Sequence, residues 1–163
     1  MIDPRWLSTW VQPRHLDEST LGEFRREFAS HPARLLVVKD FLDERVATEL
    51  SRFLGAEATF EVVHGLYSSK DNEASEGVWR RADEQDRFFR FARLTGVSPA
   101  SRLSRGVREF LRFRAALLDP RFGALFEALS GLSLASPSLN VHAMGAGDFL
   151  KIHDDQVGQR RLA

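Results

Sequence analysis

The amino-acid sequence changes character at Leu132. Before this residue, apolar side chains recur at helical spacing in several stretches, whereas Pro, Gly and short apolar runs dominate after it. Helical periodicity followed by short strand-like runs predicts an α+β fold. A chain of 163 residues is long enough for one domain with a core of its own. We therefore expect a single, mostly helical domain that runs into a β-rich segment.

Several stretches have the spacing of amphipathic helices. Leu21, Phe24 and Phe28 fall on one helical face, and Asp43 and Asp119 are suited to cap the helices that follow them. Residues 1–14 contain Trp6 and Trp10 and are expected to form an irregular arm that docks on the body. The predicted helices cover residues 16–30, 43–55, 79–94, 101–118 and 119–131.

Short apolar or β-branched runs predict the strands. The polar stretch 68–77 lacks periodicity, so we expect an exposed, mobile loop there, with the role of a substrate lid as a hypothesis. Gly145 to Asp148 should form the turn between the last two strands. The predicted strands cover residues 35–38, 59–67, 139–144 and 149–152.

Composition excludes several classes of site. The chain has no Cys, so disulfides, thiolate zinc sites and cysteine nucleophiles are excluded, and His, Asp and Glu remain as metal ligands. Equal numbers of basic and acidic residues, 23 of each, argue against a chain-wide nucleic-acid footprint. No apolar run is long enough for a membrane span, and the N-terminus does not resemble a secretory signal. We expect a cytoplasmic protein without a membrane partner.

His153 and Asp155 form the most informative pair of side chains. Alternate residues of a strand point to the same face, so both side chains could reach one ion. Imidazole nitrogen and carboxylate oxygen suit a borderline metal such as Fe(II). The alternative is a surface histidine beside two solvated acids, Asp154 and Asp155, in a turn.

The context of this pair resembles a known family. The stretch GDFLKIHDD, residues 147–155, is similar to the Gly-Asp-aromatic-Leu segment and His-x-Asp motif of the 2-oxoglutarate and Fe(II)-dependent dioxygenases, in their prolyl-hydroxylase-like branch. The continuation GQRRLA, residues 158–163, resembles the turn Gly and Arg pair that often follow. Residues 35–54 resemble the opening strand and helix of the family. Together the main motif and this opening stretch cover about a quarter of the chain.

This resemblance implies a fold and an activity. The fold would be a double-stranded β-helix, or jelly roll, with N-terminal helices packed on the major sheet. Residues 1–131 would support it, and residues 132–163 would begin its core, within one domain that spans residues 1–163. The implied reaction is hydroxylation of an unactivated C–H bond, of which a prolyl-type residue in a peptide or protein is the expected example, although a small-molecule substrate is also open. The implied cofactors are Fe(II) and 2-oxoglutarate, with ascorbate as a further candidate.

The site residues carry over one by one. His153 and Asp155 match the first two metal ligands. Met144 stands where many relatives have a tyrosine that donates a hydrogen bond to 2-oxoglutarate, a bond that methionine cannot donate. Asn140 is a second candidate for contact with the cosubstrate.

The chain also departs from the pattern of the family. The third metal ligand, a histidine, and the basic residue that holds the far carboxylate of 2-oxoglutarate follow later in the family, and the eight residues after Asp155 contain no histidine. We therefore expect the chain to be the N-terminal portion of such an enzyme. His15, His31 and His64 are expected to be surface or core residues.

Two other functions remain open. One is a non-catalytic β-sandwich or cupin-like binding module that has lost the metal. The other rests on the stretch from Arg80 to Arg114, which has ten arginines against four acidic residues and interleaved phenylalanines. This stretch could bind nucleic acid or an acidic partner. The favoured interpretation is two amphipathic helices with phenylalanines inward and arginines in water.

Overall fold

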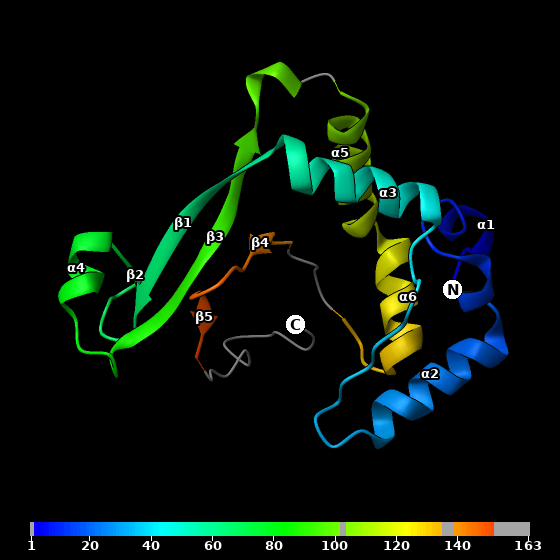
Figure 1. Ribbon diagram of the computed structural model, residues 1–163. Coiled ribbons are helices and arrows are strands. Elements are labelled where there is room, and N and C mark those ends of the chain that lie inside the picture. Colours follow the sequence, from blue (N-terminus) through cyan, green and yellow to red (C-terminus); the bar gives the residue numbers. More distant parts are fainter. Residues whose placement is uncertain (1, 102–103, 135–138, 152–163) are drawn as a thin grey trace.

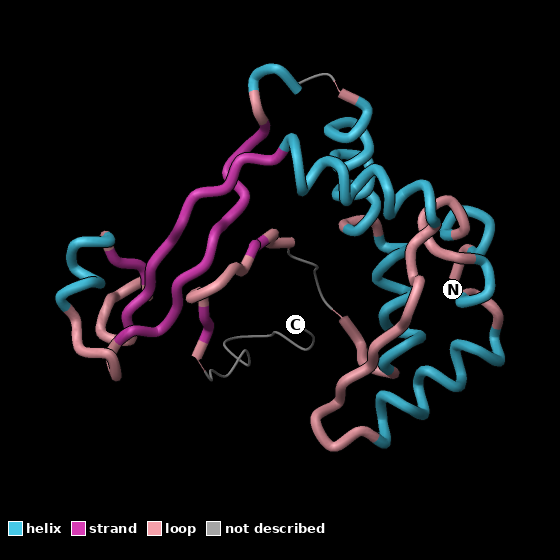
Figure 2. The backbone as a smooth tube through the Cα atoms, viewed as in Figure 1, coloured by secondary structure: helices cyan, strands magenta, loops and turns pink. Residues whose placement is uncertain are grey.

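The computed structural model describes residues 2–101, 104–134 and 139–151. It has a helical part and an open antiparallel sheet that extends away from it (Figures 1 and 2). The α+β class is therefore confirmed. None of the helices in the described ranges is both long and apolar enough to cross a membrane. The helical elements are α1 (Pro4–Leu7), η1 (Pro13–His15), α2 (Glu18–Ser30), α3 (Glu44–Arg52), η2 (Phe53–Glu57), α4 (Glu76–Arg81), η3 (Pro99–Ser101), α5 (Arg105–Leu117) and α6 (Pro120–Ser130).

Local signals start and end most of these helices. The side chains of Asp17, Asp43 and Asp119 accept hydrogen bonds from backbone N–H groups in the first turns of α2, α3 and α6. Such caps satisfy donors that have no partner within the helix. Gly131 ends α6 in the left-handed conformation, with φ 72°. The predicted helices 16–30 and 119–131 are confirmed, the prediction for 43–55 is confirmed over α3, and the prediction for 101–118 is confirmed over α5.

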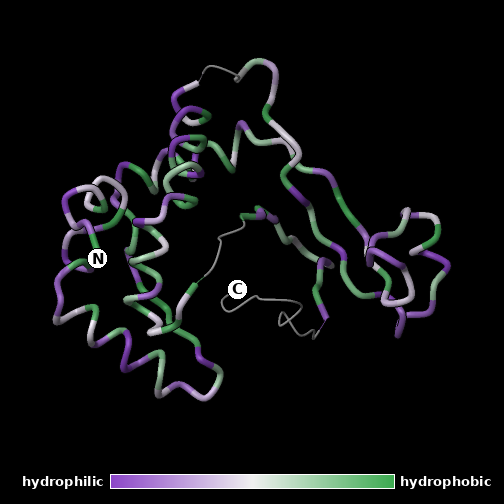
Figure 3. The backbone as a smooth tube through the Cα atoms, turned by 180° about the vertical axis from the view of Figure 1, so that it is seen from behind, coloured by the Kyte–Doolittle hydropathy of each residue, from purple (hydrophilic) through white to green (hydrophobic). Residues whose placement is uncertain are grey.

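The hydrophobic core lies among the helices. Phe122 and Leu125 of α6 are fully buried, and Val46 of α3 and Leu7 of the N-terminal arm lie in the same cluster. The arm docks on this cluster as predicted, because the Trp6 ring meets Phe122 edge-on at 5.8 Å. Hydrophobic and hydrophilic positions intermingle along the helices, as amphipathic packing requires (Figure 3).

Helix α3 runs directly into the sheet through η2, a π-helical turn. Gly55, the predicted helix end, lies inside this turn, which continues to Glu57. The predicted end is therefore two residues too early. Phe53 is fully buried and stacks on Phe110 of α5 at 4.3 Å, whereas Leu54 is exposed. The turn therefore ties the start of the sheet to the helical core.

The sheet is built around two long strands. Strand β1 (Ala58–Leu66) pairs antiparallel with β3 (Arg87–Val97) and with β2 (Glu73–Ala74) on its other edge. Strands β4 (His142–Ala143) and β5 (Phe149–Leu150) both pair with β3. The predicted strand 59–67 is confirmed, and those at 139–144 and 149–152 are each two residues long within the described chain.

The predicted helix 79–94 is wrong. Helix α4 ends at Arg81, and most of the remaining stretch is strand β3. Phe89 and Phe91 point to the same face and are both buried, which is the period of a strand rather than of a helix. The period-two pattern is masked in the sequence by Phe88 and by the surrounding arginines.

The predicted strand 35–38 is also wrong. The segment is extended but unpaired within the described chain, and Leu35 and Val37 are exposed by 55% and 70%. His31 turns the chain there, because its Nδ1 accepts hydrogen bonds from the N–H groups of Ala33 and Leu35. An apolar run forms a buried strand only where a neighbouring strand is available. The predicted loop 68–77 contains β2 and the first two residues of α4, Glu76 and Gly77.

The expected packing of helices on the sheet is not observed for α2, α5 and α6, which pack mainly with the other helices. The short α4 lies beside β1 (Figure 1). The described strands form a single open sheet, so a double-stranded β-helix is not confirmed.

Candidate functional site

The predicted metal ligands, His153 and Asp155, lie outside the described residues. The described chain leads to them through β5 and Lys151. The Lys151 N–H donates to the Phe88 carbonyl at 3.0 Å, which extends the pairing of β5 with β3 by one residue. The metal-binding role of His153 and Asp155 stays a prediction.

The two cosubstrate candidates lie on either side of β4. Asn140 is exposed, and Met144 is 58% exposed at the start of the following turn. Between them, His142 stacks on Phe91 with ring centroids 4.2 Å apart. Burial against this ring lowers the pKa of His142, and the nearby Arg93 lowers it further. Neither Asn140 nor Met144 lines the pockets described below, and contact with 2-oxoglutarate stays a prediction for both.

The Gly-Asp pair of the recognised motif has a defined structural role. Gly147 has φ 83°, a conformation that favours glycine, and it closes the turn between β4 and β5. Asp148 then accepts a hydrogen bond from the Gly145 N–H at 2.9 Å and forms an ion pair with Arg90 of β3. The turn and the first residue of β5 are thereby fixed to the central strand.

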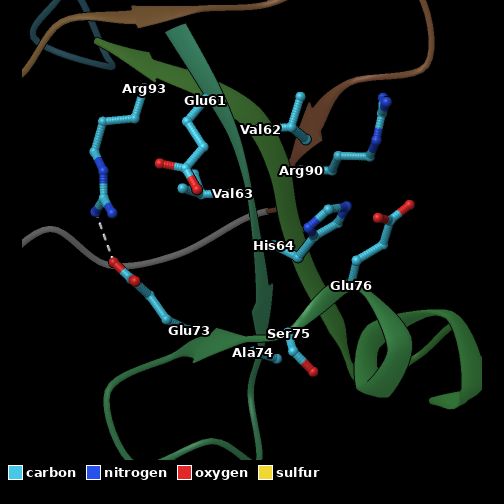
Figure 4. Close-up of a pocket in the computed structure, with 10 residues that line it drawn as sticks. All are labelled: Glu61, Val62, Val63, His64, Glu73, Ala74, Ser75, Glu76, Arg90 and Arg93. Carbon is cyan, nitrogen blue, oxygen red and sulfur yellow. Dashed lines mark hydrogen bonds and ion pairs between the residues drawn. The ribbon is translucent and has the colours of Figure 1, made fainter. Parts of the chain in front are cut away.

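A pocket of about 490 Å³ lies at the edge of β1 near the end of β2. The alternation of β1 divides its lining into two groups (Figure 4). On one side of the strand, Arg93 forms an ion pair with Glu73 at 2.7 Å. On the other side, His64 lies near Arg90 and Glu76. These three residues also line a smaller hollow, together with Trp79 and Arg80 of α4.

His64 and Trp79 form the centre of this second group. His64 is 8% exposed, and its ring lies 4.9 Å from the ring of Trp79 on α4. Arg87 holds Trp79 in place, because its Nε donates to the Trp79 carbonyl at 3.2 Å and its guanidinium lies 4.7 Å above the indole ring. Within the described chain, the buried indole Nε1 of Trp79 has no hydrogen-bond partner.

Burial sets the charge of His64. Desolvation lowers the pKa of the imidazole below its ordinary value of 6.5, and Arg90 and Arg80 lower it further, while Glu76 and Asp148 oppose them. The side-chain hydrogen bond from Arg80 lowers the pKa of Glu76. At neutral pH the pocket therefore contains a neutral imidazole beside an ionised carboxylate.

The other described histidines have structural roles. His15 is buried and its Nε2 bonds the Asp40 carbonyl at 3.1 Å, and His31 holds the turn after α2. No group of three or more His, Asp and Glu side chains in the described ranges lies close enough together to hold a metal ion. His15 and His64 are buried, whereas His31 is exposed.

Most of the described arginines between Arg80 and Arg114 are in ion pairs. The interpretation of this stretch as two amphipathic helices is wrong for its first half, which contains β3. Its acidic partners come mainly from outside the stretch, so its local positive charge is largely compensated in the fold. The ion pairs are Arg80–Glu76, Arg90–Asp148, Arg93–Glu73, Arg105–Glu49 and Arg112–Glu109.

The cluster around His64 is not predicted from the sequence. The cause is the helix predicted for residues 79–94, which hid the pairing of His64 with Arg90 on adjacent strands. The alternation of Phe89 and Phe91 was the available signal.

Comparisons of the chain with models of known families, with curated proteins and with solved structures find no match.

Proposed function

We propose that this chain is part of an Fe(II)- and 2-oxoglutarate-dependent oxygenase of the prolyl-hydroxylase-like type, and that its open sheet is part of a double-stranded β-helix. The proposal begins from the His-x-Asp motif and the Gly-Asp-Phe-Leu segment before it. The observation that supports it most is strand β5: the segment directly upstream of the motif is a strand, anchored to β3 through Asp148 and Arg90.

Strand geometry matters because the chemistry needs two ligands on one face. Phe149 shares a face of the sheet with His64 and Arg90, as the pairing of Arg90 with both residues shows. Residues 149, 153 and 155 have the same parity in the sequence. The proposal requires the alternation of β5 to continue as far as residue 155, so that His153 and Asp155 serve as ligands on that face.

In this proposal each part of the chain has a distinct task. His153 and Asp155 hold the metal, and Asp148 and Arg90 orient the strand that carries them. Bound Fe(II) and 2-oxoglutarate supply the oxidising chemistry for hydroxylation. Asn140 and Met144 remain candidates for contact with the cosubstrate, and a prolyl-type residue in a peptide is the proposed substrate.

Binding of Fe(II) under anaerobic conditions, measured by titration calorimetry, tests this proposal. We expect His153→Ala and Asp155→Ala each to weaken Fe(II) binding by more than about tenfold, since each removes a direct ligand. Asp154→Ala is the matched control, because on an alternating strand Asp154 faces away from His153 and Asp155. This variant should bind Fe(II) as tightly as the parent chain does. Equal affinity in the parent chain and His153→Ala would reject the metal role.

A further inference from the structure

The hollow between β1, β3 and α4 is rich in hydrogen-bond donors. It measures about 360 Å³ and is lined by His64, Glu76, Trp79, Arg80, Arg87, Arg90 and Gly147. Its lining includes His64 and Arg90, which pair across β1 and β3, and neither member of the Arg93–Glu73 pair. None of its lining residues belongs to the predicted metal site.

Several of these donors are left without a partner in the described chain. The Trp79 Nε1 is buried and makes no hydrogen bond within the described residues, and the His64 side chain beside it is also buried. Arg87 uses Nε and one terminal nitrogen, Nη2, on the carbonyls of Trp79 and Arg80, so its Nη1 is left over. A buried donor without a partner costs about 1–3 kcal/mol, which a bound acceptor would recover.

The acceptors at this place are already engaged. Glu76 accepts two hydrogen bonds from Arg80, and Asp148 pairs with Arg90. The guanidinium groups of Arg80, Arg87 and Arg90 therefore face two carboxylates. This leaves one positive charge beside the uncharged His64. A single negative charge would neutralise this excess, whereas a doubly charged ion would meet repulsion from Glu76 and Asp148.

From this arrangement we propose that the hollow formed by His64, Trp79 and Arg87 binds a carboxylate group of a ligand. A carboxylate is planar and offers two acceptor oxygens, which match guanidinium and indole N–H donors held by the fold. The ligand would thus be an organic acid or an acidic side chain of a peptide. This inference uses no metal and is independent of the proposed oxygenase activity.

Nuclear magnetic resonance of the ¹⁵N-labelled full chain in metal-free buffer tests the proposal, without a chelator, because common chelators carry carboxylates that would compete with the probe. Propionate is the probe, and propionamide, which has nearly the same shape without the charge, is the control ligand. We expect propionate to shift the indole N–H signal of Trp79 downfield in a saturable manner, and propionamide to leave it in place. A response that rises linearly without saturation, or an equal response to propionamide, would overturn the proposal.

Trp10 provides an internal control, because its Nε1 is also buried and without a partner in the described chain but lies in the helical core. Its signal should not move. In Trp79→Phe, followed through the ring protons of His64, the dissociation constant for propionate should rise about five- to tenfold, the worth of one lost hydrogen bond. Inorganic phosphate is the competing probe: saturation by phosphate without saturation by propionate would contradict the carboxylate assignment.

Discussion

Arg90 of β3 and Asp148 of the turn before β5 form an ion pair although they are 58 positions apart in the sequence. The Asp148 side chain is only 11% exposed, so water screens this pair weakly. The pair joins the last described strand to the centre of the sheet. Together with the pairing of β5 and β3, it fixes the segment that precedes the His-x-Asp motif.

Asp148→Asn should lower the free energy of unfolding by about 1–2 kcal/mol, because it leaves the Arg90 guanidinium partly buried without its counter-charge. Urea unfolding followed by circular dichroism measures this change. The matched control is Glu73→Gln in the Arg93–Glu73 pair, whose side chains are 43% and 53% exposed. That change should stay within about 0.5 kcal/mol, and equal losses in both variants would contradict the assigned role of Asp148.

Stability should fall below pH 6.5 in a way that depends on His64. Burial lowers the pKa of His64 in the folded chain below its ordinary value of 6.5, so the unfolded chain takes up the proton first as the pH falls. The stabilising contribution is therefore present above pH 6.5 and is lost as the pH falls below it. His142 has a pKa shift in the same direction. Urea midpoints between pH 7.5 and pH 5, which span roughly one unit above and one and a half units below the ordinary pKa, should decline less steeply in His64→Phe than in the parent chain. Parallel curves would rule out the contribution of His64.

Gly65 of β1 and Gly123 of α6 should respond to alanine in opposite directions. A Cβ on Gly65 would lie 2.3 Å from the Phe89 ring, so Gly65→Ala must displace that buried ring and should cost about 1–3 kcal/mol. A Cβ on Gly123 meets nothing within 4 Å, so Gly123→Ala should stabilise the helix by about 0.5–1 kcal/mol. Thermal unfolding of the two variants gives both signs, and a stabilised Gly65→Ala would mean that Phe89 does not cover β1.

Leu35→Ala and Leu125→Ala test where the core lies. Leu125 is fully buried in α6, and its truncation should cost about 2–5 kcal/mol through lost burial and a cavity. Leu35 is 55% exposed in the unpaired segment after α2, so its truncation should change stability by less than about 0.5 kcal/mol. Chemical denaturation of both variants compares them directly. A large loss in Leu35→Ala would show that residues 35–38 are buried after all.

The sequence by itself determined the features that depend on near neighbours. Asp43 and Asp119 cap their helices through backbone N–H groups two or three residues away, and Gly131 ends α6 through its own backbone freedom. Such interactions involve only residues that are close together in the sequence, so the order of the residues is enough to predict them. The β-branched run of β1 was recognised for the same reason.

Only the tertiary structure decided which apolar runs became strands and which side chains met. Residues 87–97 form a strand because β1 supplies hydrogen-bond partners about 20 to 40 positions away, whereas residues 35–38 have no such neighbour in the described part of the chain. The meeting of His64, Trp79 and Arg90 follows from that pairing. Strand identity depends on partners distant in the sequence, and a local pattern does not contain that information.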